Sequence, residues 1–296
     1  IEDSLDTGGQ NFTINGGKRL SMDAGSIVVV SGGTCTRTGE LTLDATSTVK
    51  YTGCGSTMQP ETYGNLIHDG GILSQEAGGT LTVAGTFTNT SGNFAASQNI
   101  TAKGIIWTLG SVTGSPSQTW DIGTDGIDIN GGTLVATTGT FTLAGNWDNS
   151  GTATLAGSTV NFDGGTAQTI TSGGSAFSSV SISNTAATVS NADAFIFSNG
   201  ATLTIDASAT FATAGFPFTT SGGLITNNGT FQMNGDEVTT AALSIPGNTK
   251  FVDASGATLT STLNGLVNVT FDASGQTFVF GESMTYITGD ITVASG

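Results

Sequence analysis

The 296-residue sequence is poor in positive charge, and this excludes several classes of partner. Lys and Arg together number 6, against 22 Asp and Glu, so the formal net charge is −16. So few cations cannot neutralise a track of phosphates, and we therefore expect no nucleic-acid partner. The acidic balance also argues against attraction to an anionic membrane surface.

Long apolar runs and helical periodicity are also absent. The longest apolar stretches are as short as Ile27-Val28-Val29-Val30, whereas a membrane helix needs a run of about 18 apolar residues. We therefore expect no membrane insertion. Apolar residues recur at every second position instead of following the period of a helix, with β-branched Thr between them. This alternation predicts strands.

Gly, Thr and Ser dominate the composition without making the chain disordered. They number 45, 53 and 30, or 43% of the residues. Leu, Ile, Val and Phe together make 23%, above the roughly 20% below which a chain fails to form a core. Clusters of Gly, Asn and Asp separate the alternating segments, as is typical of tight turns. We predict an ordered, all-β protein.

Internal repeats indicate the architecture. The segment at residues 79–85 (GTLTVAG) returns at 139–145 (GTFTLAG) and at 229–235 (GTFQMNG). Successive copies begin 60 and 90 residues apart. A repeating unit of about 20 residues accounts for both separations, and this is the length of one coil of a β-solenoid. We predict one continuous right-handed parallel β-solenoid over residues 1–296, with about 14 coils of roughly 20 residues. Residues 104–130 fit the repeat least well, and we expect a loop excursion there.

The aligned repeats predict which side chains form the core, because a strand alternates its faces with each residue. The side chains expected to point inward are Phe141, Leu143, Phe162, Phe177, Ile182, Leu203, Ile205 and Phe231. Those expected to face outward are Thr142, Asn161, Thr204 and Gln232.

The repeats are similar to those of a known group of proteins. A Gly-Thr-aromatic-Thr-apolar strand followed by Asn149-Ser150-Gly151-Thr152 resembles the coils of large bacterial surface proteins. These include parallel β-helices of the filamentous-haemagglutinin and autotransporter-passenger type. The resemblance covers most of the chain and implies a secreted protein with a structural or adhesive role. The sequence departs from such proteins in lacking a recognisable secretion or anchoring domain, which leaves the export route open.

The two cysteines, Cys35 and Cys54, are separated by about one coil. Such a separation places them on adjacent strands, at a distance that a disulfide accepts. We predict a disulfide between them, with two buried small residues as the alternative. A disulfide, the acidity and the small number of Lys residues predict an extracellular or cell-surface location.

The densest acidic cluster consists of Asp121, Asp125 and Asp128. Converging carboxylates could bind calcium, the one cofactor that the sequence suggests. Alternatively, each aspartate caps a turn by accepting backbone N–H groups. The same turn-capping role is expected for the Asp-Ala series, which consists of Asp23, Asp44, Asp206, Asp253 and Asp272. Asp236 and Glu237 follow a glycine and are expected to lie in a solvated turn.

The tryptophans and the single histidine are the side chains that we considered for a binding site. Trp107 and Trp120 are candidates for contact with a ligand or partner such as a surface carbohydrate, with core packing as the alternative. Trp147 aligns with Phe87 in the repeat and is expected in the core. His68 is the only histidine and lies in no catalytic motif, so we expect it to be structural.

Neither end of the sequence shows a capping helix or a polar terminal coil, and the chain begins at Ile1 without Met or a leader. The chain is therefore either a processed form or a fragment. An uncapped solenoid ends in an unpaired strand. We therefore predict head-to-tail assembly of copies, with an edge that includes Phe12, Ile14, Val28 and Val30.

Three functions fit the sequence. The first is a secreted structural subunit of a cell-surface fibre, filament or surface layer. The second is an adhesin or carbohydrate-binding rod. The third is a β-helix polysaccharide-degrading enzyme, but cations are scarce and no facing carboxylate pair stands out. We expect the structural role and no enzymatic activity.

Overall fold

The chain folds entirely into strands in the part that the structure describes. The computed structural model describes residues 4–8, 12–14, 19–31, 34–37, 40–53, 55–58, 61–75, 78–114, 118–136, 138–235, 237–238, 243–252, 258–259, 263–272, 277–280 and 287–294. All regular elements in these residues are strands. A helix long and apolar enough to cross a membrane is not found among them.

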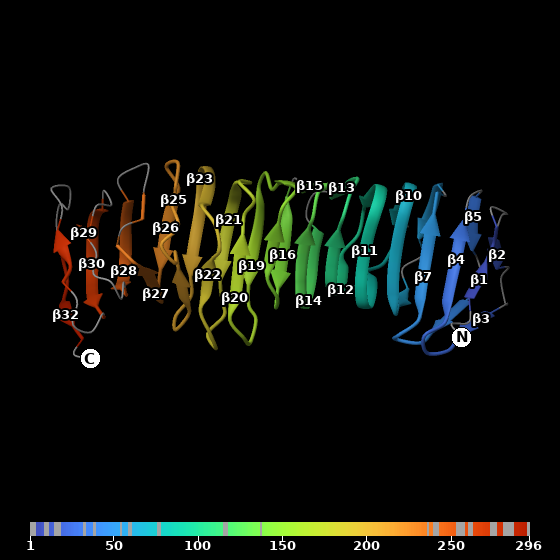
Figure 1. Cartoon of the computed structure of the whole chain (residues 1–296), viewed down its shortest axis with the longest axis horizontal. Coiled ribbons are helices and arrows are strands. Elements are labelled where there is room, and N and C mark those ends of the chain that lie inside the picture. The colour runs from blue at the N-terminus through green and yellow to red at the C-terminus, as the bar shows by residue number, and fades with distance from the viewer. Residues whose placement is uncertain are drawn as a thin grey trace. The chain divides into compact units, whose positions relative to one another are not determined.

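The contacts within the chain define two compact units. The N-terminal unit comprises Ile1–Gly145 and Asn149–Leu155, and the C-terminal unit comprises Asn146–Asp148 and Ala156–Gly296. Each unit is a parallel β-solenoid, in which the strands of successive coils lie side by side (Figure 1). The predicted all-β parallel solenoid is confirmed.

Each coil of the N-terminal unit contributes to three rows of paired strands. Row 1 contains β1 (Ser4–Asp6), β4 (Ile27–Ser31), β7 (Thr48–Thr52), β10 (Asn65–Gln75), β11 (Leu81–Ala96), β12 (Ile100–Trp107) and β14 (Gln118–Ile129). Row 2 contains β2 (Phe12–Ile14), β5 (Thr34–Arg37), β8 (Gly55–Met58), the ends of β10 and β11, β13 (Ser111–Gly114), β15 (Thr133–Ala136) and β18 (Thr152–Thr154). Row 3 contains the pair β3 (Arg19–Met22) and β6 (Glu40–Leu43), then β9 (Thr62–Tyr63), the starts of β11, β12 and β14, and β16 (Gly139–Leu143).

The C-terminal unit is built in the same way. Row 4 contains β17 (Trp147–Asn149), β20 (Gln168–Thr171), β22 (Val189–Asn191), β24 (Thr210–Ala212), β27 (Thr230–Met233), β28 (Leu243–Phe251), β30 (Leu263–Phe271) and β32 (Ile291–Val293). Row 5 contains β19 (Ser158–Phe162), β21 (Phe177–Ile182), β23 (Phe195–Ile205) and β26 (Leu224–Asn227). The remaining pairs join the start of β23 to β25 (Phe218–Thr219), and β29 (Thr258–Leu259) to β31 (Val279–Phe280).

Strand registers give the length of a coil. In row 1, Leu5 lies opposite Val28, Val28 opposite Val49 and Val49 opposite Leu66, so successive partners are 23, 21 and 17 residues apart. The predicted coil of about 20 residues is therefore confirmed. The structure supports about 11 turns instead of the 14 predicted.

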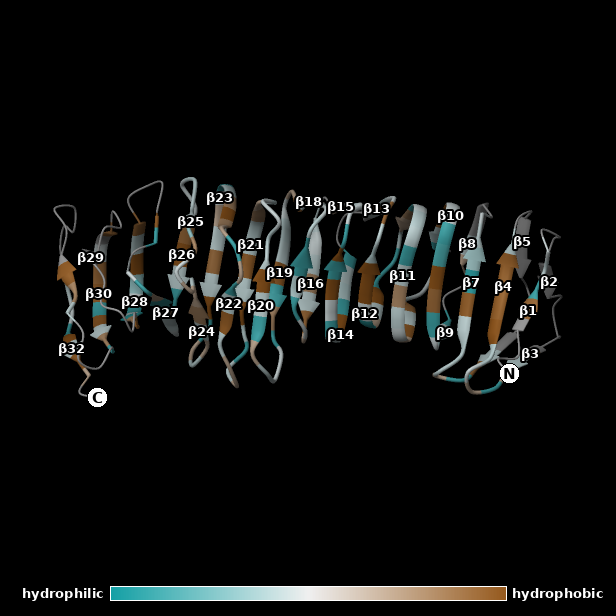
Figure 2. Cartoon of the chain, viewed as in Figure 1, coloured by the Kyte–Doolittle hydropathy of each residue, from teal (hydrophilic) through white to brown (hydrophobic). Residues whose placement is uncertain are grey.

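The alternation of apolar and polar side chains builds the core as predicted. All eight residues expected to point inward are buried, with at most 3% of their surface exposed. Thr142, Asn161, Thr204 and Gln232, which lie between them, are partly exposed. Figure 2 shows the corresponding alternation of hydropathy along the strands. The hydrophobic side of each strand therefore faces the inside of its coil.

Residues 104–130 do not leave the stack, contrary to the predicted excursion. In β12 and β14, Ile105 lies opposite Ile127 and Trp107 opposite Ile129, while β13 pairs with both β11 and β15. The repeat is less regular here because β12 and β14 pass a corner with a register shift between Ala102 and Gly104. Within this range, only residues 115–117 lie outside the described part.

A column of glycines forms one corner of the N-terminal unit. Gly92 and Gly110 have φ values of 86° and 82°, in the left-handed region that favours glycine. A Cβ added to Gly110 would overlap the carbonyl oxygen of Gly92. The same close approach continues from Gly110 to Gly132 and from Gly132 to Gly151. Coils can therefore stack closely at this corner because no side chain separates their backbones.

Candidate assembly interface

The first described coil of the N-terminal unit has an open apolar core. Among the described strands, β1 pairs with β4 alone, so no other described strand borders β1. Leu5 of β1 lies opposite Val28 of β4. Val28 is 5% exposed, whereas Leu5 is 46% exposed, because nothing described covers the inner side chains of this coil on the β1 side.

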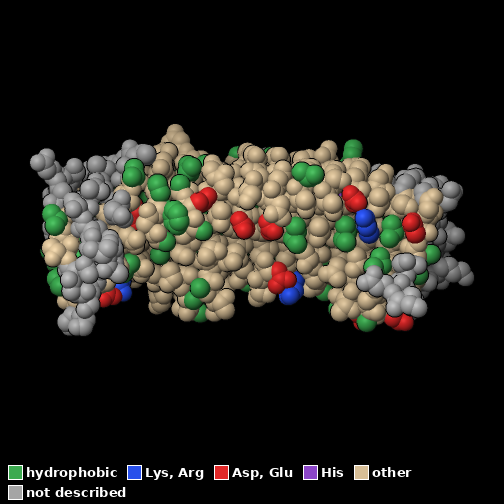
Figure 3. All heavy atoms as spheres, viewed as in Figure 1, with side chains coloured by type: hydrophobic (Ala, Val, Ile, Leu, Met, Phe, Trp, Pro, Cys, Tyr) green, Lys and Arg blue, Asp and Glu red, His purple; other side chains and the backbone are tan. Residues whose placement is uncertain are grey.

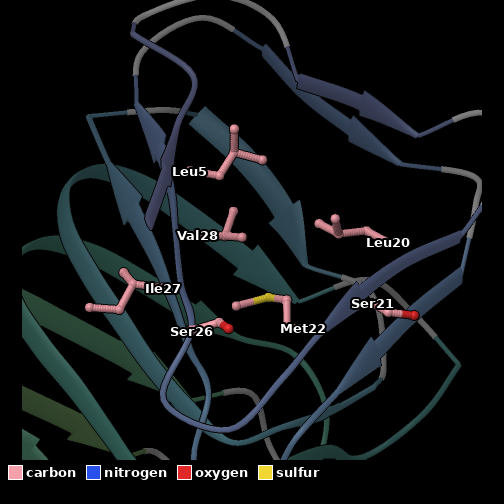
Figure 4. A pocket seen from close by; sticks show the side chains of 7 residues that line it. All are labelled: Leu5, Leu20, Ser21, Met22, Ser26, Ile27 and Val28. Carbon is pink, nitrogen blue, oxygen red and sulfur yellow. The ribbon is translucent and has the colours of Figure 1, made fainter. Parts of the chain in front are cut away.

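A cavity of about 210 Å³ lies within this coil. Figure 4 shows Leu20 of β3 across the cavity from Leu5 of β1 and Val28 of β4. Most of its lining is aliphatic, and two serine hydroxyl groups lie among the side chains. We call this cavity the N-terminal socket, and its lining residues are Leu5, Leu20, Ser21, Met22, Ser26, Ile27 and Val28.

The last described strand, β32, also has an uncovered inner face. Among the described strands it pairs with β30 alone, with Ile291 opposite Val269 and Val293 opposite Phe271. Val269 and Phe271 are buried at 1% and 7% exposure, but Ile291 and Val293 are 59% and 77% exposed. Ile291 and Val293, which we call the C-terminal plug, therefore occupy core positions of the repeat without the cover that core residues have.

The two open edges are complementary in their hydrogen bonding. In a parallel stack every strand runs in the same direction, so each coil offers N–H and C=O groups to the coil on either side. The free edge of β32 thus has the geometry that the strand preceding β1 would have. Exposed strand edges of this kind are templates for pairing with another chain.

The predicted assembly edge is only partly supported. Val28 and Val30 lie on β4, which is covered by β1 on one side and β7 on the other, and both are buried. They therefore do not lie on the outermost described strand, because the register places one more coil before them, but Val28 still lines the N-terminal socket. Phe12 and Ile14 lie on β2, whose described pairing is with β5, and their side chains are outside the described part.

The predicted contact role of Trp107 and Trp120 is also wrong. Their exposures are 1% and 3%, which leaves no face for a sugar or a partner. Trp107 lies 5.7 Å from Phe87 between ring centroids, and Trp120 lies 5.1 Å from Phe141. Both occupy the inner positions of their strands, as does Trp147, whose place in the core is confirmed.

The three aspartates proposed for calcium do not form a site. Asp125 makes an ion pair with Lys103, at 2.9 Å between Nζ and Oδ2. Asp128 accepts a hydrogen bond from Asn130 Nδ2 at 3.0 Å, and Asp121 is exposed on the outer face of β14. No group of three acidic, histidine or cysteine side chains suited to a metal occurs among the described residues.

Turn capping is confirmed for one member of the Asp-Ala series. The Asp44 carboxylate accepts hydrogen bonds from the backbone N–H of Thr46 at 2.8 Å and from its hydroxyl group at 2.7 Å. Both bonds hold the pKa of Asp44 below its usual value, with the hydroxyl contributing most. Hydrogen bonds to the ionised form stabilise it, so this turn is best formed with a charged aspartate.

Two polar groups are buried more deeply than the sequence suggests. Glu237 is 1% exposed and accepts hydrogen bonds from the hydroxyl of Thr213 at 2.5 Å and from the N–H groups of Asn234 and Gly235 at 2.6 and 2.7 Å. The predicted solvated turn is therefore wrong for Glu237, while Asp236 lies outside the described residues. His68 is fully buried, with Nδ1 2.5 Å from Asn89 Oδ1, in agreement with a structural position.

The lysines form ion pairs between successive coils. Lys50 pairs with Asp69 at 3.0 Å, Lys103 with Asp125 at 2.9 Å and Lys250 with Asp272 at 2.5 Å. These are all the lysines whose side chains are described. Each pair is partly exposed, so its contribution to stability is small, about 0–1 kcal/mol. Their effect is to favour one register between neighbouring coils.

The ion pair of Lys50 predicts a pH dependence. The hydrogen bond from Lys50, supported by one from Ser91, holds the pKa of Asp69 below its usual value against partial burial. A lowered pKa in the folded state contributes stability above the unfolded pKa, and this is lost as the pH falls through the folded pKa. We therefore expect Lys50→Met to lose less stability than the wild type between about pH 5 and pH 2.

Chemical denaturation at several pH values measures this difference. Asp69→Asn should remove the same acid-dependent component, and combining it with Lys50→Met should add nothing further. A Lys50→Met variant with the full acid dependence of the wild type would contradict the assignment.

The described register includes only one of the two cysteines. Cys35 lies opposite Ser56 in the next coil, two positions beyond Cys54, because this coil spans 21 residues and the cysteines are 19 apart. Cys54 lies outside the described residues, and no disulfide is seen in the described part. The disulfide therefore stays a prediction.

Sequence reasoning missed the importance of Leu5, Ile291 and Val293. The alternation at residues 291–293 indicates a strand, but alternation alone does not show whether a neighbouring coil covers its inner side chains. A comparison of the positions in the repeat could have assigned Ile291 and Val293 to the inner face. Their exposure is a property of the stack.

No protein-family model, curated protein or solved structure matches this chain. The parallel β-solenoid fold is shown by the structure itself. The resemblance to bacterial surface proteins stays a prediction.

Proposed function

We propose that the chain is a secreted structural subunit that builds a cell-surface fibre, filament or layer by stacking its copies end to end. The observation that carries this proposal is the pair of open coils, in which Leu5 at one edge and Ile291 and Val293 at the other are core residues exposed to solvent. Covering them with a second copy buries apolar surface and pairs two strand edges at once.

The sides of the coils support the same proposal. Figure 3 shows a face on which most side chains are neither charged nor hydrophobic, as expected for outward Thr, Ser and Asn. The coils also expose single apolar side chains elsewhere, among them Ile72, Leu109 and Leu224, whereas aliphatic residues are grouped in the socket and the plug. With a net charge of −16, copies repel one another laterally, which favours growth at the ends over bundling.

The alternative functions have less support. A carbohydrate-binding rod needs exposed aromatic side chains for stacking on sugars, and the two tryptophans considered for this role are buried. A polysaccharide-degrading enzyme needs two facing carboxylates, and Asp125 of the β14 cluster is bound to Lys103 instead. The structural role, its extracellular location and the absence of catalysis are thus the interpretation that we favour.

Salt should strengthen the association of the chain with itself. The charges of the copies repel over about 30 Å at 0.01 M salt but over only about 8 Å at 0.15 M, while apolar end contacts do not depend on ion pairs. We expect the mean mass in sedimentation experiments to rise with protein concentration, and to rise further between these two salt concentrations. Electron microscopy of the same samples should show particles that lengthen without thickening.

A protein that stays monomeric at every concentration and both salt levels would refute end-to-end assembly. Association that weakens as salt increases would assign the contact to ion pairs instead of the apolar ends.

A further inference from the structure

The N-terminal socket has the size and chemistry of a site for aliphatic side chains. Its volume of about 210 Å³ exceeds the roughly 150 Å³ of an apolar cavity that accommodates benzene. Leu5, Leu20, Met22, Ile27 and Val28 supply most of the lining. None of the described residues that line it is cationic or acidic, so these residues offer a charged small molecule no counter-ion.

The strand beside the socket specifies an occupant with an extended backbone. The inner residue of β1, Leu5, is next to a free strand edge, so an occupant that fills the cavity can also pair its backbone with β1. Asp6 points outward, since its carboxylate accepts hydrogen bonds from Gly8 N at 2.9 Å and Ser31 Oγ at 2.8 Å. These bonds keep its charge on the surface and out of the cavity.

The C-terminal plug meets these requirements. Ile291 and Val293 project from the same side of β32, because residues two apart on a strand share a face. That side is the inner one, as their buried partners Val269 and Phe271 show. Val28 and Val30 of β4 show the same arrangement of two inward aliphatic side chains within the stack.

We propose that the socket under Leu5 receives Ile291 and Val293 from β32 of a second copy of this chain, with β32 pairing in parallel to β1. This inference rests on the proposed end-to-end assembly and specifies the residues that make the junction. Every junction joins different surfaces of two copies, so an open assembly always keeps one free socket and one free plug and can grow further.

Mixing two single variants tests the junction directly. Leu5→Asp places a charge in the socket, and Val293→Asp places one on the plug. Both residues are substantially exposed in the single chain, so neither substitution removes a buried contact required for folding. Burying the new carboxylate in the junction is unfavourable, and each variant alone should need about tenfold or more higher concentration to associate.

The equimolar mixture should behave differently from either variant. A Leu5→Asp chain keeps its plug and a Val293→Asp chain keeps its socket, so one intact junction can form between them. We expect dimers at the concentration at which the wild type associates, without longer species. Thr292→Asp, on the outer face of β32, is the matched control and should associate like the wild type.

Cross-linking gives an independent measure. The cross-linking variants carry Cys35→Ser and Cys54→Ser, so that only the introduced cysteines react. Leu5→Cys is combined with Ile291→Cys in one variant and with Val293→Cys in another, because β32 can pair with β1 with either residue opposite Leu5. Oxidation should produce a covalent ladder for one of these pairs. The pair of Leu5→Cys with Thr292→Cys should give none, because the two sulfur atoms face opposite sides.

The outcomes separate this junction from the proposed function. If the wild type associates but the mixture of variants stays monomeric and no ladder forms, the socket–plug junction is wrong and assembly uses another surface. If the wild type itself never associates, the proposed function fails. Association of both single variants at the wild-type concentration would also overturn the junction.

Discussion

Replacing Gly110 with alanine is expected to lower the free energy of unfolding of the N-terminal unit by about 3 kcal/mol or more. Gly110 has a φ of 82°, which costs a residue with a side chain about 1–2 kcal/mol. The new Cβ would also overlap the carbonyl oxygen of Gly92 and lie 2.8 Å from its nitrogen. These are backbone atoms of the preceding coil, so the coils would have to separate at this corner. Urea denaturation followed by tryptophan fluorescence measures the loss.

Gly25→Ala is the matched control for this substitution. Gly25 has a similar φ of 75°, but a Cβ at this position meets no atom of the described residues within 4 Å. Its cost should therefore be limited to the backbone conformation, about 1 kcal/mol. Equal losses for the two variants would show that close stacking at the glycine corner does not contribute to stability.

Phe195→Ala is expected to destabilise the C-terminal unit by about 3–5 kcal/mol. Phe195 is fully buried, and its ring centroid lies 4.9 to 5.7 Å from those of four other phenylalanines. The truncation would leave a cavity in contact with several successive coils, because these rings are stacked between coils and cannot all close the gap. The four neighbouring rings are Phe177, Phe197, Phe211 and Phe218.

Phe216→Ala provides the comparison within the same unit. Phe216 is 37% exposed, and its loss should cost less than about 1 kcal/mol. Thermal unfolding followed by circular dichroism would rank the two variants. A Phe195→Ala protein as stable as Phe216→Ala would contradict the conclusion that the phenylalanine cluster stabilises the core of this unit.

The two classes of prediction address separate properties of the solenoid. Gly110 and Phe195 act within one chain, through the stacking of interior coils, and their effects should be visible in a monomer. Leu5 and Val293 act at open coils and should change association with little effect on the stability of the chain itself. If the substitutions at Gly110 and Phe195 changed only association, and those at Leu5 and Val293 changed only stability, the coils would not be covered and uncovered as described.

The sequence by itself determined the strands and the side of each strand that is buried. Phe141, Leu143 and Thr142 follow the pleat, in which neighbours point to opposite faces. The preference of Thr and of branched apolar residues for extended backbone, together with glycine at turns, requires no knowledge of distant contacts. The repeat near 20 residues then implies coils, because so short a unit cannot bury its own apolar face.

The tertiary structure decided which coils lie against each other and what is left uncovered. The register between coils depends on the length of each turn, and measured steps vary from 17 to 23 residues. This variation places Cys35 opposite Ser56. It also makes Val28 an interior residue and leaves Leu5 and Val293 exposed. Alternation specifies the inner face of a strand, but only the neighbouring coil determines whether that face is covered.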